Sequence, residues 1–164
     1  MHPAIATLLV GALFLGSFTG LTVLRRQQPS LRFLVEGAVL TACGIIAALA
    51  GAPLHPILFL VILYVLTMRV RLLVDAGNAL SARARHRGAL RLADLALRLG
   101  PDAASRQIAL INRGVMQLRA GEAQAAYFTI KGALIDEPLK PAARYQAAGF
   151  YNLGVACLRS DRPQ

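Results

Sequence analysis

The chain has 164 residues, 56 % of them hydrophobic, and a formal net charge of +10 at pH 7. Residues 1–68 carry four charged side chains, whereas residues 69–164 carry fifteen Lys or Arg and seven Asp or Glu. This composition excludes a protein that is soluble and globular throughout. It fits an apolar membrane anchor (1–69) joined to a charged domain (70–164). Because aromatic residues are not interleaved with the basic ones, we expect no nucleic-acid partner.

Three apolar segments predict transmembrane helices at about 4–24, 33–52 and 54–69. The first two meet the requirement of about 20 residues for crossing about 30 Å of hydrocarbon at 1.5 Å per residue. The third is short, since its apolar run ends at Met68. It spans the bilayer only if the helix continues beyond Arg69 and the basic side chains reach back to the interface.

The basic residues between these segments predict the topology. The first connection contains Arg25, Arg26 and Arg32, the second (53–56) contains no Lys or Arg, and the segment after Met68 is rich in Arg. The positive-inside rule then places the N-terminus outside and residues 70–164 in the cytoplasm. Arg greatly outnumbers Lys and no transit segment is evident, so we expect an integral protein of a bacterial plasma membrane.

Small residues follow one face of each of the first two predicted spans, and such faces let membrane helices approach closely. The two faces could pack against each other or against a foreign subunit, or they could reflect the general abundance of Gly and Ala in membrane helices. The first face comprises Ala12, Gly16 and Gly20, and the second comprises Gly37, Thr41 and Gly44.

No combination of residues predicts an enzyme or a cofactor site. Glu36 follows Arg32 by one helical turn, which favours an ion pair at the membrane interface over a proton or ion relay. Cys43 and Cys157 lie in different parts of the chain, so we expect neither a disulfide nor a metal site. The five serines lack a His/Asp arrangement, and there is no phosphate-binding loop.

The charged domain contains a spacing that occurs twice. Small residues separated by 12 and 7 residues, followed 5 residues later by a proline, predict two helices that cross closely and then end. The first set is Gly77, Ala89, Ala96 and Pro101, and the second is Gly114, Ala126, Ala133 and Pro138. A third helix of the same kind begins in the segment 150–156.

This pattern resembles the tetratricopeptide repeat, a helix–turn–helix unit of about 34 residues. The units would cover about 70–103, 107–138 and, in part, 147–164. The resemblance implies an all-α protein in which three transmembrane helices precede an α-solenoid of about two and a half hairpins. A generic array of helical hairpins is the alternative.

In the tetratricopeptide family the first helices of the units line a concave face that holds peptides or partner helices. The resemblance therefore implies a candidate peptide groove comprising Asn78, Ser81, Asn112, Val115 and Tyr151. Some members clamp a C-terminal carboxylate with Lys, Arg and Asn. Asn78 and Asn112 match the asparagines of that clamp, whereas Val74 and Ala148 stand where two of its lysines would be. Asn112 and Asn152 are alternatively expected to cap or bridge helices.

The densest cluster of charge predicts a basic surface, which a solvent layer or an acidic partner protein would cover. It comprises Arg83, Arg85, Arg87, Arg91 and Arg98. The sequence as a whole favours a membrane-anchored scaffold whose repeats bind or assemble partner proteins on the inner face of the membrane. The alternative is a small structural subunit of a larger membrane complex, for example a respiratory, photosynthetic or transport complex.

Overall fold

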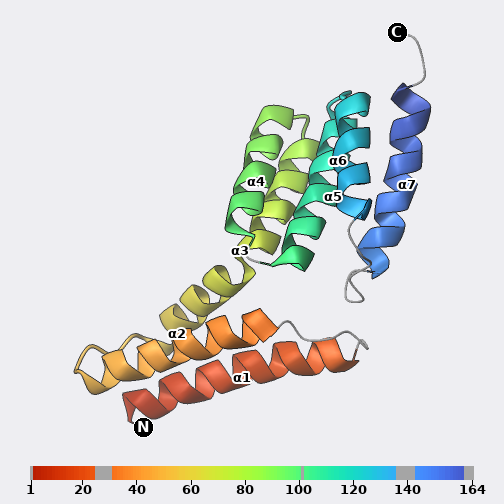
Figure 1. Cartoon of the computed structure of the whole chain (residues 1–164). Helices are drawn as coiled ribbons and strands as arrows, with labels where there is room; N and C mark the ends of the chain where they lie inside the picture. The colour runs from red at the N-terminus through yellow and green to blue at the C-terminus, as the bar shows by residue number, and fades with distance from the viewer. Residues whose placement is uncertain (1, 25–30, 101, 136–142, 161–164) are drawn as a thin grey trace. The chain divides into compact units, whose positions relative to one another are not determined.

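The computed structural model describes residues 2–24, 31–100, 102–135 and 143–160. These residues form seven α-helices and no β-strand, so the predicted all-helical class is confirmed. The chain divides into two compact units, residues 1–68 and 69–164, and α3 contributes to both. The helices, which Figure 1 labels, are α1 (Pro3–Leu24), α2 (Leu31–Leu49), α3 (Pro56–Ala82), α4 (His86–Leu99), α5 (Ala103–Arg119), α6 (Ala123–Ile135) and α7 (Ala143–Ser160).

Three of these helices, α1, α2 and α3, are long and apolar enough to cross a membrane. Their lengths of 22, 19 and 27 residues correspond to about 33, 28 and 40 Å at 1.5 Å per residue. The apolar run of the third helix ends near residue 69, but the helix itself continues to Ala82. It can continue because no proline follows the apolar run.

A narrow seam of small residues joins α1 to α2 in the first unit. Gly11 packs against the Thr41 side chain, and Gly37 packs against Leu15. The hydroxyl of Thr41 donates a hydrogen bond of 2.7 Å to the carbonyl oxygen of Gly37 one turn earlier, which satisfies this polar group inside the seam. Close approach of the two helices therefore depends on glycines that leave room for single larger side chains.

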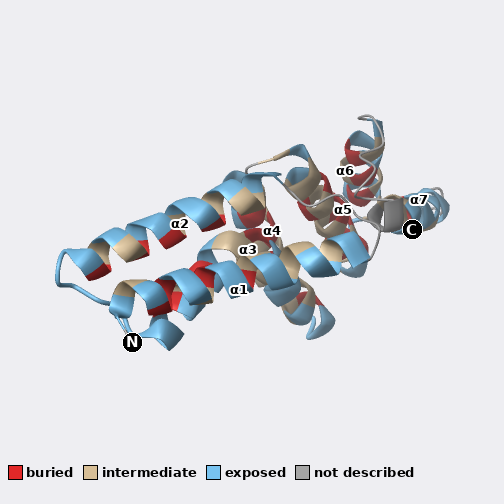
Figure 2. Cartoon of the chain, turned by 90° about the horizontal axis from the view of Figure 1, so that it is seen from below, coloured by how far each residue is buried: buried red, intermediate tan, exposed pale blue. Residues whose placement is uncertain are grey.

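Outside this seam the surface of the first unit is apolar. Figure 2 shows the buried residues of α1 and α2 as short patches on helices whose other residues are exposed or only partly buried. Large aliphatic side chains such as Leu13, Ile46 and Ile57 are each more than 60 % exposed. An aliphatic surface of this extent is unfavourable in water and suits the hydrocarbon of a bilayer.

In the second unit each helix packs against the next one along the chain. Figure 1 shows α4, α5, α6 and α7 side by side, and α5 also contacts α7. The glycines explain the spacing of 12 residues. A Cβ added to Gly77 would lie 3.3 Å from the carbonyl oxygen of Ala89, and one added to Gly114 would lie 3.5 Å from that of Ala126. Both helix pairs thus cross at a glycine that faces the backbone of the following helix.

The ends of α3 and α5 repeat as well. Ala84 has a φ of 57°, and the amide of Arg85 donates a 3.0 Å hydrogen bond to the carbonyl oxygen of Leu80. Gly121, 37 residues after Ala84, has a φ of 85°. The equivalent hydrogen bond follows it, because the amide of Glu122 donates a 2.9 Å bond to the carbonyl oxygen of Gln117. Both helices therefore end in a left-handed residue that closes a Schellman motif. Pro101 and Pro138, which were predicted to end the second helices, lie outside the described residues.

Candidate protein-binding surface

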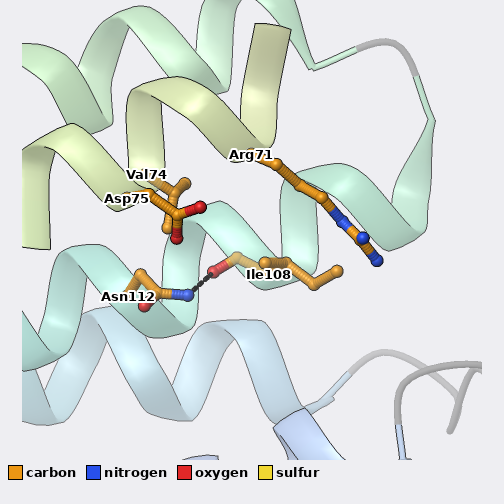
Figure 3. A pocket seen from close by; sticks show the side chains of 5 residues that line it. All are labelled: Arg71, Val74, Asp75, Ile108 and Asn112. Carbon is orange, nitrogen blue, oxygen red and sulfur yellow. Dashed lines mark hydrogen bonds between the residues drawn. The ribbon is translucent and has the colours of Figure 1, made fainter. Parts of the chain in front are cut away.

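A shallow depression of about 190 Å³ lies between α3 and α5 in the second unit. Arg71, Val74 and Asp75 line it from α3, and Ile108 and Asn112 line it from α5 (Figure 3). The three α3 residues share one helical face because they are spaced by three and four positions, and the two α5 residues are also four apart. The depression therefore lies where polar side chains of α3 and α5 meet above the buried Val74.

The two charged residues of the depression have opposite signs and stand at its opposite ends. In Figure 3 Asp75 projects towards Asn112, whereas Arg71 extends beside Ile108. Neither side chain forms an ion pair or a hydrogen bond with another described residue. Between them Val74 is buried and contributes an apolar floor. The arrangement offers a ligand one cation, one anion and a small apolar contact, which are the elements of non-covalent peptide or protein binding.

Two asparagine amides fix α3 against α5 beside the depression. The side-chain NH₂ of Asn78 donates a 2.9 Å hydrogen bond to the side-chain oxygen of Asn112. The NH₂ of Asn112 donates a 2.8 Å bond to the carbonyl oxygen of Ile108, which Figure 3 marks with a dashed line. Since both ends of the Asn112 amide are engaged inside the protein, this residue positions the surface. This is the bridging role expected as the alternative to a clamp.

The predicted groove residues divide into three groups. Asn112 lines the depression and Asn78 is bonded to it. Val115 is half-buried on α5, and Tyr151 is 72 % exposed on α7, but neither lines the depression. Ser81 is only 3 % exposed, so it lies beneath the surface rather than on it.

Four residues that line the depression were missed by the sequence prediction. Arg71 and Asp75 fell within the first predicted repeat unit but were not named as groove residues, Val74 was noted only as the position of a clamp lysine, and Ile108 was not singled out. The signal that could have identified them is the run of spacings from Arg71 to Asn78, which places all four α3 positions on one face. In α5, the spacing of four residues between Ile108 and Asn112 likewise places both on one face.

The predicted basic surface lies around the end of α3 and along α4. All five of its arginines are exposed, and no guanidinium group among them makes an ion pair or hydrogen bond with a described residue. The acidic residue of α4, Asp94, is already paired, because one of its carboxylate oxygens lies 2.8 Å from the Nε of Arg113 on α5. Solvent or an anionic partner is therefore left to neutralise this positive charge. The members of the basic surface are Arg83, Arg85, Arg87, Arg91 and Arg98.

The two small-residue faces predicted for the membrane helices differ in the structure. Gly37, Thr41 and Gly44 are buried in the first unit and contact neighbouring side chains. Ala12, Gly16 and Gly20 are exposed, and a Cβ added to either glycine would meet nothing within 4 Å. The contact of α1 with α2 is made instead through the face that contains Gly11, so the stripe from Ala12 to Gly20 stays open.

The ion pair expected at Glu36 is present. The Nε of Arg32 lies 2.9 Å from a carboxylate oxygen of Glu36. Cys43 and Cys157 are free and exposed. Among the described residues, no group of three or more His, Cys, Asp or Glu side chains is placed to hold a metal ion. No protein-family model matches the chain, and no curated protein and no solved structure shows significant similarity to it.

Proposed function

We propose that this protein is a membrane-anchored scaffold whose helical domain, residues 70–164, binds partner proteins. The observation that carries the proposal is the depression between α3 and α5. It presents Arg71 and Asp75 with no ion-pair partner among the described residues. A partner segment that carries an acidic and a basic group on either side of a small apolar residue would complement it. Three helices that could cross a membrane provide the anchor.

We further propose that the helical domain is a tetratricopeptide-like solenoid of about two and a half hairpins. Its support is the recurrence of the same contacts after 37 residues. Gly77 and Gly114 each face the backbone of a residue 12 positions later, and Ala84 and Gly121 end equivalent helices in the left-handed region. Recurring contacts of this kind are what stacked repeats require.

The proposed location is the plasma membrane of a bacterium, with the helical domain in the cytoplasm. The support comes from the distribution of Arg, which is absent from the connection between α2 and α3 and abundant after Met68. The Arg-rich connection 25–30 lies outside the described residues. The exposed arginines of α4 would then face the cytoplasm, where acidic proteins can reach them.

Photo-crosslinking of the full chain in its native membrane tests the scaffold proposal. A photoreactive amino acid replaces Asp75 in the depression, and the matched control carries it at Lys131, an exposed position on α6. The proposal predicts a discrete adduct with one or a few proteins from position 75 and much less of the same adduct from position 131. Equal yields from the two positions, or no adduct from position 75, would reject the depression as the binding surface.

The stripe from Ala12 to Gly20 favours a second candidate function, that of a small structural subunit in a larger membrane complex. Neither Gly16 nor Gly20 has a neighbour within 4 Å of an added Cβ, so a foreign membrane helix could approach α1 closely there. In that case Gly16→Leu should release the chain from a large particle extracted in a gentle detergent. A particle of unchanged size would argue against the subunit function.

A further inference from the structure

The outward side of α7 is an uncharged apolar face that no described residue covers. Phe150 is 60 % exposed, and Tyr151 and Leu158 are each 72 % exposed. A Cβ added to Gly154, in the middle of this face, would meet nothing within 4 Å. Helix faces open to water normally carry charged residues, so this composition requires an explanation. We call this surface the α7 face; its exposed members are Ala147, Phe150, Tyr151, Gly154, Cys157 and Leu158.

The relation of α7 to α5 shows what kind of surface this is. The side-chain NH₂ of Asn152 bonds to a carbonyl oxygen one turn earlier at 2.7 Å, as that of Asn112 does at 2.8 Å. Gly154 follows Asn152 by two positions, and Gly114 follows Asn112 by two positions. The two helices therefore correspond residue by residue with an offset of 40.

The inner side of α7 is packed as the inner side of α5 is. Met116 of α5 lies in a buried cluster with Ala89 and Ala93 of α4. At the corresponding position Ala156 of α7 lies in a buried cluster with residues of α6. Thus α7 stands against α6 as α5 stands against α4.

The difference between the two helices lies on their other side. In α5 this side is covered, and Gly114 there packs against Ile130 of α6. Five α5 positions on it are buried, namely Gln107, Ile111, Gly114, Gln117 and Leu118. The five α7 positions 40 residues later, Ala147, Tyr151, Gly154, Cys157 and Leu158, are all exposed. The α7 face is therefore a helix-packing surface in the register of α5 that none of the described helices covers.

We propose that the α7 face of a second copy of this chain covers it, with Gly154 of the two copies in contact near a two-fold axis. In such an isologous contact the same patch of both copies is used, so that residue i of one copy contacts residue j of the other and residue j contacts residue i. The face suits this because Phe150 and Leu158 stand four residues before and after Gly154, so large side chains flank a small centre. Because no exposed member of the face is charged, pairing two copies brings no like charges together.

Membrane anchoring makes this contact effective, so the proposal rests in that respect on the proposed function. One face of an 18-residue helix buries less than the roughly 800 Å² per partner that is typical of specific complexes. Copies held in one membrane plane have a high effective concentration, and a contact too small for dilute solution can then persist. We therefore expect pairing in the membrane and dissociation on dilution in detergent.

Disulfide trapping in native membranes tests the proposal with the full chain. Cys43→Ala and Cys157→Ala remove both native thiols, and Gly154→Cys then places one thiol at the expected axis, where the Cα atoms come within the roughly 4–7 Å of a disulfide. The matched control is Gly132→Cys on α6, which is also exposed with nothing within 4 Å of its Cβ. We expect mild oxidation to give at least ten times more reducible dimer from Gly154→Cys than from Gly132→Cys. Adding Phe150→Glu should remove that excess.

Two results would overturn the proposal. One is equal dimer yield from Gly154→Cys and Gly132→Cys. The other is a disulfide from Gly154→Cys to a different protein, which would mean that another partner covers the α7 face. The depression between α3 and α5 lies on a different pair of helices. If no photo-crosslinked adduct forms from position 75, the scaffold function is rejected, and the dimer result is unaffected.

Discussion

The residue that ends α3 provides a test of the repeated helix ends. Ala84 adopts a φ of 57° at the position where Gly121 adopts 85° in the next helix pair. Left-handed backbone is strained for a residue with a Cβ and unstrained for glycine. We therefore predict that Ala84→Gly stabilises the helical domain and that the reverse change, Gly121→Ala, destabilises it.

The two effects should be similar in size and opposite in sign. Left-handed backbone costs an alanine about 1–2 kcal/mol. Replacing this alanine by glycine also stabilises the unfolded chain by roughly 0.4–1 kcal/mol, because glycine makes that chain more flexible, and this offsets part of the gain. The net change in the free energy of unfolding is thus about 0.5–1 kcal/mol in each direction. No clash complicates the comparison, since a Cβ added to Gly121 would meet nothing within 4 Å.

A urea titration of the full chain in a mild detergent, followed by far-ultraviolet circular dichroism, measures this difference. The micelle is expected to keep α1 and α2 helical, so the transition reports on the second unit. With an m-value of about 1–3 kcal/mol/M, the midpoint should move by about 0.5 M, upwards for Ala84→Gly and downwards for Gly121→Ala. A downward shift for Ala84→Gly would refute the reasoning from the φ angle.

Three further changes test the packing. Gly114→Ala should lower the free energy of unfolding by about 1–3 kcal/mol, because the added methyl group collides with Ile130 of α6. The control Gly132→Ala adds its methyl group in open space and should raise the free energy of unfolding slightly. Equal effects of the two changes in the same urea titration would contradict this. Asp102→Ala should cost about 1 kcal/mol, because its carboxylate accepts the Ser105 amide at 2.8 Å and caps α5; an unchanged midpoint would contradict the cap. A double-mutant cycle of Asn78→Ala and Asn112→Ala should give a coupling free energy of about 0.5–1.5 kcal/mol, and additive effects would deny the bond between them.

The membrane helices could be predicted from the sequence because their signal is local. Apolar runs of about 20 residues have few alternatives, and three helices able to cross a membrane are present. The length of α3 could not be read in the same way. Its apolar run ends at Met68, but Arg, Leu and Ala are all good helix formers and nothing before Ala82 stops the helix.

The candidate binding surface was harder to predict because it depends on tertiary packing. Asn78 and Ser81 are only three positions apart, yet one bonds across to α5 and the other is buried. Arg71 and Asp75 fell within the first predicted repeat unit without being singled out, and only the contact of α3 with α5 places them beside Asn112. Sequence spacing shows which residues share a helix face, but it does not show which face a neighbouring helix covers.

Quantitative co-purification tests the central claim, that the depression between α3 and α5 holds partner proteins. The full chain is extracted from its native membrane in a gentle detergent, and the recovered proteins are compared for the wild type, Arg71→Glu and the exposed control Lys131→Glu on α6. The scaffold function predicts a defined set of partners that falls about tenfold or more with Arg71→Glu and persists with Lys131→Glu. Recovery of the same partners in the same amounts from all three proteins would contradict it.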